Sequence, residues 1–218
     1  MEQDLIHRRP FLFASLAFGL SYPLASYIYM PEMIAILWKM AAVGCLALYA
    51  LRNHSHGHFA ILASFLLFYS LGDGLIEFEL IYGAIAFAIG HFIAIYLFLQ
   101  NRRTSLNFSQ KLLALFLPII TPLIAWTIIS SPEQSGYDVA IYSFIIALMA
   151  AFAWTSSFPR YRVGLGAISF IISDLLIFQR MNMLSDIIWL NLLIWYGYYF
   201  GVFLMATGIV QTLRKKGT

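Results

Sequence analysis

Long apolar stretches separated by short polar breaks run through almost the whole chain. A bilayer core about 30 Å thick needs roughly 20 apolar residues per helix. The charges and turn residues divide the chain into eight stretches of suitable length. This pattern predicts an all-α, polytopic membrane helix bundle with eight transmembrane helices. The predicted spans lie near residues 11–29, 33–51, 59–78, 80–99, 112–130, 139–157, 163–179 and 187–212.

Several of the connections between these spans are very short. Met30-Pro31-Glu32 separates the first two spans, and Phe78-Glu79 separates the third and fourth. Consecutive spans joined this closely must be antiparallel neighbours. We therefore expect a single integral membrane domain over residues 1–218, without a separate soluble domain. The first span begins too late and runs too long for a removable signal peptide, so we expect a retained helix.

Composition agrees with this class of protein. The chain is 61% hydrophobic, 17% aromatic and 11% charged, with a mean hydropathy of +0.82. A soluble domain averages about 45–50% apolar and 25% charged residues. The net charge of +3 disfavours a nucleic-acid partner, and the single Cys45 cannot form an internal disulfide.

Basic residues alternate from loop to loop, as the positive-inside rule requires. Only Arg180 falls in an intervening loop, and only Lys39 lies within a span. We therefore expect both termini in the cytoplasm, and a compact chain without retrieval signals favours a bacterial inner membrane. The basic residues on the cytoplasmic side are Arg8, Arg9, Arg52, Arg102, Arg103, Lys111, Arg160, Arg162, Arg214, Lys215 and Lys216.

Three ionisable residues within the spans are the most informative positions, because charges in a membrane are costly. At 1.5 Å per residue, Lys39 lies roughly 9 Å below the outer end of its predicted span, and Asp73 and Asp174 roughly 7 Å below theirs. Two carboxyl groups, one held neutral and one ionised, are the arrangement that general acid–base hydrolysis requires. A structural alternative is an Asp–Lys pair that locks two helices, with the second aspartate bonded to Ser173 or to the backbone.

Other polar residues within the spans form a second tier of candidates. His91 lies about 16 Å below the outer surface and either contributes to the site or bonds to a neighbouring helix. Glu77 either enlarges the acidic site or lies in water at the interface. A polar cavity could also be lined by serine and tyrosine side chains, namely Ser70, Ser173, Tyr196, Tyr198 and Tyr199.

Signatures of other hydrolase mechanisms are missing from the sequence. It contains no Gly-x-Ser-x-Gly elbow, Walker loop or His-Glu-x-x-His motif. The histidines of His54-Ser55-His56-Gly57-His58 have no acidic or cysteine ligand beside them, so we interpret this tract as a surface loop. His91 is the one histidine within a span, so we expect neither a metal nor another cofactor.

The order of these residues resembles the YhhN-type lysoplasmalogenase family. The segment from Gly166 to Asp174 is similar to the Gly-Ala-x-x-Phe-x-x-Ser-Asp motif of that family. Lys39, Gly72-Asp73 and the pattern Gly83-x-x-x-Phe87-x-x-x-His91 extend the resemblance over residues 35 to 205. The chain departs from the family pattern at Tyr69, where a serine is expected, and in the last span, where Tyr196 and Tyr199 lack the glutamine that accompanies tyrosine.

The resemblance implies an enzyme that hydrolyses the vinyl ether bond of lysoplasmalogen, with an ethanolamine or choline headgroup. The products are a fatty aldehyde and a glycerophospho-alcohol, and the partners are the lysophospholipid and membrane lipid. Asp73 and Asp174 are the implied acid and base. The implied supporting residues are Lys39, His91, Ser173, Ser70, Tyr196 and Tyr199.

A second interpretation, from a different functional class, uses the same residues. Intramembrane carboxylates also relay protons in small proton-coupled transporters and lipid carriers. On physical grounds alone, Asp73, Asp174 and Lys39 fit that function equally well. An enzyme consumes its substrate in detergent, whereas a transporter requires a sealed membrane.

Overall fold

Helices make up nearly all of the described chain. The structure, a computed structural model, describes residues 9–53, 57–129, 136–182 and 187–216. Within these ranges 88% of the residues are helical and none lies in a strand, which confirms the all-α prediction. An isolated bridge between Arg102 and Ser156 is the one β-type pairing in those ranges.

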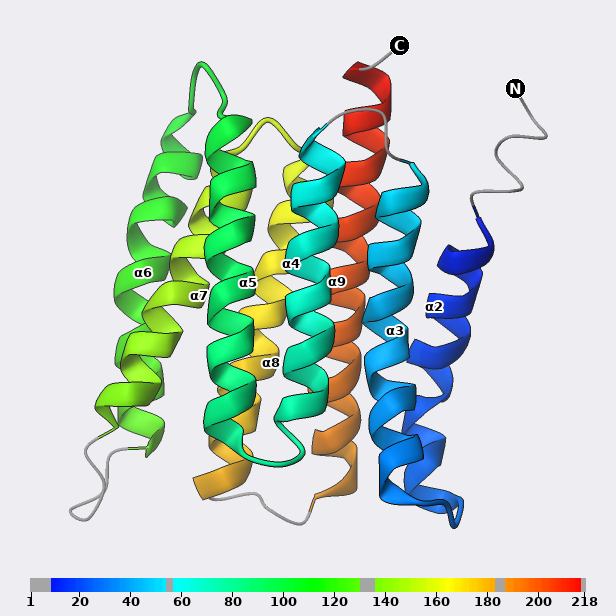
Figure 1. Ribbon diagram of the computed structural model, residues 1–218. Helices are drawn as coiled ribbons and strands as arrows, with labels where there is room; N and C mark the ends of the chain where they lie inside the picture. Colours follow the sequence, from blue (N-terminus) through cyan, green and yellow to red (C-terminus); the bar gives the residue numbers. More distant parts are fainter. Residues whose placement is uncertain (1–8, 54–56, 130–135, 183–186, 217–218) are drawn as a thin grey trace. The chain divides into compact units, whose positions relative to one another are not determined.

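Seven helices of the described chain are long and apolar enough to cross a membrane. They correspond to the second to eighth predicted spans and are labelled in Figure 1. Their bounds are α3 Glu32–Arg52, α4 Gly57–Leu75, α5 Leu80–Gln100, α6 Phe108–Ile129, α7 Tyr137–Thr155, α8 Leu165–Asn182 and α9 Ile188–Lys216.

The first predicted span has a different local structure. It consists of an α-helix, α2 Pro10–Ser21, continued by a 3-10 helix, η1 Tyr22–Tyr27. Pro23 lies in the first turn of η1, where it has no backbone N–H to donate to the preceding turn. The α-helix therefore ends before it reaches the length that spans a bilayer alone.

Helix boundaries also correct the depths expected for the ionisable residues. Because α4 ends at Leu75, Asp73 lies about 3 Å before its end, and Glu77 lies in the following turn. Because α8 continues to Asn182, Asp174 lies about 12 Å before its end. The helix ends therefore do not reproduce the equal depths expected from the hydropathy pattern.

The chain forms two compact units, which we describe separately. The first comprises Met1–Leu97 and Ala206–Thr218. In it α3 packs against both α2 and α4 (Figure 1). Ser15 ties α2 to α3, because its hydroxyl donates a 2.6 Å hydrogen bond to the carbonyl of Ala42. Buried side chains such as Leu46, Leu62 and Phe65 form the apolar interior.

The second unit comprises Phe98–Met205. In it α6 packs against α7 and α8, and α8 also packs against α7. A π-helix, η2 Arg160–Gly164, leads directly into α8. Arg103 closes the end of α7, because its guanidinium donates to the carbonyls of Ser156 at 2.9 Å and Phe158 at 3.2 Å.

In the second unit α8 and α9 come very close at two glycines. A Cβ atom at Gly166 would lie 2.5 Å from the carbonyl oxygen of Gly201, and one at Gly201 would lie 2.6 Å from that of Gly166. Small residues allow membrane helices to approach to backbone contact. Gly197, one turn earlier on α9, differs because its nearest neighbour would lie 3.7 Å from an added Cβ.

This difference gives a test of the α8–α9 contact. We expect Gly201→Ala to lower the free energy of unfolding by about 1–3 kcal/mol, because backbone atoms cannot move aside as a flexible side chain can. Gly197→Ala is the matched control and should leave stability nearly unchanged. Thermal unfolding of the purified protein in detergent measures both, and equal melting temperatures would show that the contact does not limit stability.

Candidate active site

Asp73 lies in the last turn of α4, between two glycines at which neighbouring helices come close. A Cβ atom at Gly72 would lie 2.8 Å from the ring of Phe87 on α5, and one at Gly74 2.5 Å from the sulfur of Met40 on α3. The side chain of Asp73 is 2% exposed. The Gly-Asp-Gly sequence therefore places a carboxyl group within the closely packed part of the first unit.

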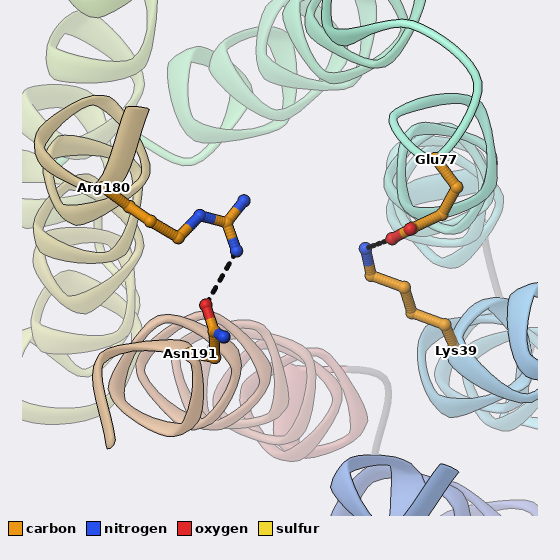
Figure 2. Close-up of polar contacts among 4 residues, drawn as sticks. All are labelled: Lys39, Glu77, Arg180 and Asn191. Carbon is orange, nitrogen blue, oxygen red and sulfur yellow. Dashed lines mark hydrogen bonds and ion pairs between the residues drawn. The ribbon is translucent and has the colours of Figure 1, made fainter. Parts of the chain in front are cut away.

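Lys39 forms an ion pair with Glu77, between Nζ and Oε1 (Figure 2). The lysine side chain is 14% exposed and the glutamate side chain 36%. The lysine nitrogen also lies 5.9 Å from the centre of the Tyr22 ring. The carboxylate of Glu77 therefore balances the charge of the intramembrane lysine, a role beyond the two that the sequence suggested for Glu77.

The hydroxyl of Ser70 is used in helix packing. It donates a 2.8 Å hydrogen bond to the backbone carbonyl of Met40 on α3. A Cβ atom on Gly44 of α3 would lie 3.3 Å from the same hydroxyl oxygen. Ser70 thus links α4 to α3 one turn before Asp73.

His91 is fully buried and bonds to the residue at which the chain departs from the family pattern. Its Nδ1 lies 2.8 Å from the hydroxyl oxygen of Tyr69 on α4. The two rings are arranged edge to face at 5.2 Å, and Tyr69 also contacts the ring of Phe65. A Cβ atom at Gly90 would lie 2.6 Å from the Tyr69 ring, so this glycine makes room for the tyrosine.

The segment of α8 from Gly166 to Asp174 contacts two neighbouring helices, α9 and α7. Ser169 donates a 2.7 Å hydrogen bond to the carbonyl of Gly197, and Ser173 donates one of 2.7 Å to that of Ile194. Phe170 is fully buried and lies edge to face with Tyr198 at 4.9 Å. Positions spaced by three or four residues share one helix face, so this face of α8 packs against α9.

Asp174 is the residue after Ser173, and its side chain bonds to α7 instead of α9. Its Oδ2 accepts a 2.7 Å hydrogen bond from the hydroxyl of Tyr142. The side chain is 7% exposed, and Oδ1 has no hydrogen-bond partner among the described residues. The ring of Tyr142 lies edge to face with Phe178, one turn after Asp174. Tyr142 therefore holds one carboxylate oxygen in place, and a role for the other in binding a ligand stays a prediction.

The tyrosines of α9 lie among other aromatic rings. Tyr199 is fully buried and stacks on Trp195, with ring centres 5.9 Å apart and an interplanar angle of 12°. Tyr196 is only partly buried and stacks on Phe200 at 5.9 Å. These ring contacts show packing along α9, and a role for either hydroxyl in substrate binding stays a prediction.

Sequence reasoning assigned no role to Tyr142 and treated Tyr69 only as a departure from a pattern. Both residues lie within helices rather than at helix ends. Tyrosines of membrane proteins concentrate at the interfaces, where the hydroxyl reaches water. A tyrosine inside a span needs a buried polar partner. The positions of Tyr69 and Tyr142 along their spans could therefore have indicated that each hydroxyl bonds to a buried polar side chain.

The structure places the two candidate carboxyl groups in different units, Asp73 in the first and Asp174 in the second. Their pairing in one site stays a prediction. Among the described residues no group of three His, Cys, Asp or Glu side chains could hold a metal ion. Of the histidine tract, residues 54–56 lie outside the described ranges, and His58 belongs to the first turn of α4.

Comparison with known proteins gives one match. The model of the YhhN family matches residues 34–209, which include most of α3, all of α4 to α8 and most of α9. This family is associated with hydrolase activity. No curated protein and no solved structure matches the chain.

The Tyr69–His91 contact can be tested through stability. Tyr69→Phe keeps the ring but removes this partner of a buried imidazole, so we expect unfolding to become easier by about 1–3 kcal/mol. Tyr82→Phe, at a tyrosine that is 53% exposed on α5, is the control. If chemical unfolding in detergent gives the same free energy for both variants, the hydrogen bond makes no net contribution to stability.

Proposed function

Because the chain belongs to the YhhN family, we propose that it is a lysoplasmalogenase-type hydrolase. Its proposed substrate is an alkenyl glycerophosphoethanolamine or glycerophosphocholine, whose vinyl ether bond it cleaves. The products are a fatty aldehyde and a glycerophospho-alcohol. The observation that supports this proposal most is the buried Asp174, with Oδ2 held by Tyr142 and Oδ1 without a partner among the described residues.

The chemistry of the bond explains why carboxyl groups suit the reaction. A vinyl ether resists bases and nucleophiles, but it accepts a proton at the carbon β to the ether oxygen. The resulting oxocarbenium ion is captured by water, which loses a proton to a base. The hemiacetal then collapses to an aldehyde and an alcohol. The slow step needs a positioned acid, and a carboxyl group held neutral in a low-dielectric surrounding can supply the proton.

In this proposal Asp73 and Asp174 are the acid and the base. A carboxylate also stabilises the positive charge that develops on the oxocarbenium ion. Tyr142 keeps the Asp174 carboxylate in one orientation, which leaves Oδ1 for water or substrate. His91, held by Tyr69, supports the Asp73 side, and Ser70 and Ser173 support the two carboxyl groups through helix packing. The partly buried Tyr196 would contact the substrate.

We also propose the membrane arrangement that the sequence predicts. At about 1.5 Å per α-helical residue and 2.0 Å per 3-10 residue, α2 and η1 together reach about 30 Å. This length matches a bilayer core, so α2 with η1 would form the first of eight spans. Both termini would then lie in the cytoplasm, as expected for a multi-pass protein of a bacterial inner membrane. The basic last turn of α9, with Arg214, Lys215 and Lys216, supports that orientation.

Aldehyde release in detergent tests the reaction. We expect the purified wild type to release a fatty aldehyde from lysoplasmalogen, and Asp73→Asn and Asp174→Asn to reduce the rate at least about 100-fold, the scale of general acid–base catalysis. Asp138→Asn is the matched control, because Asp138 is exposed in the first turn of α7.

Two results would count against this function. A folded wild type that releases no aldehyde from either the ethanolamine or the choline substrate contradicts the hydrolase. Proton-coupled uptake of a lipid by the same protein in sealed vesicles would then favour the transporter, the alternative that the intramembrane carboxylates also support.

A second prediction separates positioning from folding at Asp174. Tyr142→Phe removes one hydrogen bond to a carboxylate, so we expect kcat to fall about tenfold to 100-fold with KM nearly unchanged. Tyr137→Phe changes a tyrosine that is 63% exposed on the same helix and should leave kcat unaltered. Equal kcat values for Tyr142→Phe and the wild type would show that Tyr142 only packs against α8.

A further inference from the structure

Two cations, Lys39 and Arg180, differ from all the others in the chain because they interrupt the positive-inside pattern. Lys39 is balanced by the carboxylate of Glu77. Arg180 instead donates from Nη1 to the carboxamide oxygen of Asn191 at 2.9 Å (Figure 2). An amide is neutral, so this contact orients the guanidinium without cancelling its charge. Among the described residues Arg180 forms no ion pair.

The remaining polar groups of this pair are almost all donors. A guanidinium carries five N–H groups in a planar fork, and a carboxamide carries two. One N–H of Arg180 is used in bonding to Asn191, and the oxygen of Asn191 receives it. Within the described chain, the pair therefore presents a positive charge with several N–H groups that the contact between Arg180 and Asn191 does not use. Such a donor set recognises a phosphate, to which arginine can donate two parallel hydrogen bonds.

The α8–α9 register shows how far along α8 this guanidinium lies. Gly166 lies opposite Gly201, and Ser173 lies opposite Ile194. The two helices are therefore antiparallel, and a step of one residue toward the C-terminus of α8 corresponds to a step of one residue toward the N-terminus of α9. Continued by three residues, the same register places Asn191 level with position 176 of α8. That position is about 3 Å along the helix axis from Asp174.

Arg180 lies four residues after position 176, the position of α8 that is level with Asn191. Side chains of a helix lean toward its N-terminus, and the bond to Asn191 shows that Arg180 follows this tendency. The guanidinium thus extends back along α8 toward the level of Asp174. In a lysophospholipid only the glycerol backbone separates the phosphate from the ether bond, so a phosphate site at this level fits the reacting carboxylate.

We propose that Arg180, oriented by Asn191, binds the phosphate of a lysophospholipid. This assignment rests on the proposed function for the identity of the lipid. The second unit would then supply both a carboxylate, from Asp174, and a phosphate-binding group, from Arg180. Arg180 selects phosphate-bearing ether lipids over neutral alkenylglycerols of the same chain length.

The test is a binding measurement with lipids that cannot react. A saturated 1-O-alkyl lysophosphoethanolamine keeps the phosphate but lacks the vinyl ether, and 1-O-alkylglycerol lacks the phosphate as well. We expect Arg180→Gln to weaken binding of the phospholipid at least about tenfold and to leave binding of the alkylglycerol unchanged, as measured by tryptophan fluorescence in detergent. Arg180→Lys keeps the charge but loses the fork, so its affinity should lie between those of the wild type and Arg180→Gln.

Arg160→Gln is the matched control, because Arg160 lies at the opposite end of the η2–α8 segment and over the ring of Tyr161. Unchanged phospholipid affinity in Arg180→Gln would overturn the assignment. An equal loss of affinity for the phospholipid and the alkylglycerol would also overturn it, since that result indicates that the Arg180–Asn191 contact only holds α8 and α9 together. Failure of the proposed hydrolase is a separate outcome, because it appears as absent aldehyde release while phosphate-dependent binding persists.

Discussion

The backbone contact between Gly166 and Gly201 is the constraint on which the second unit depends most. With neither residue carrying a Cβ, α8 and α9 approach until backbone atoms touch. This contact sets the register that brings the hydroxyls of Ser169 and Ser173 to carbonyls of α9. Because that face of α8 packs against α9, Asp174, the residue after Ser173, points about 100° away from α9 around the helix axis. Its carboxylate then meets Tyr142 on α7.

Among the described residues, four serine hydroxyls link neighbouring helices, whereas other hydroxyls bond to a carbonyl of their own helix, as Ser64 does to Ala60 and Thr155 to Ala151. Within a bilayer a polar side chain has no water to bond with, so it bonds to a backbone carbonyl of its own helix or of a neighbouring one. Ser15 and Ser70 bond to a neighbouring helix in the first unit, and Ser169 and Ser173 do so in the second. Not every buried hydroxyl is satisfied in this way, because Ser143 Oγ on α7 has no hydrogen-bond partner among the described residues. Asp174 likewise uses only Oδ2, which accepts the hydrogen bond from Tyr142.

The structure shows how the chain accommodates a tyrosine at position 69, where the resemblance leads us to expect a serine. A tyrosine is much larger than the serine expected at this position, and the absence of a side chain at Gly90 gives its ring the space it needs. The hydroxyl then reaches Nδ1 of His91 across two helices. A hydrogen bond at one imidazole nitrogen determines which role the other can take, so Tyr69 influences what His91 can do.

Much of the fold followed from the sequence by itself. Runs of apolar residues were sufficient to locate seven helices within a few residues, because membrane insertion depends on hydrophobicity averaged over about 20 positions. The same reasoning singled out Lys39, Asp73 and Asp174, since a charge in an apolar run is conspicuous. The motif from Gly166 to Asp174 likewise identified α8 as the helix that carries the second carboxylate.

Only the tertiary structure decided which groups meet. The pairing of Lys39 with Glu77 required α4 to end at Leu75, and that of Asp174 with Tyr142 required the rotation of α8 against α7. The break between α2 and η1 was also invisible to an average over the whole span. Hydropathy reports how apolar a segment is, whereas partners depend on helix rotation, register and the exact last turn. Those quantities are set by contacts between helices, which join residues about 20 to 40 positions apart in the sequence.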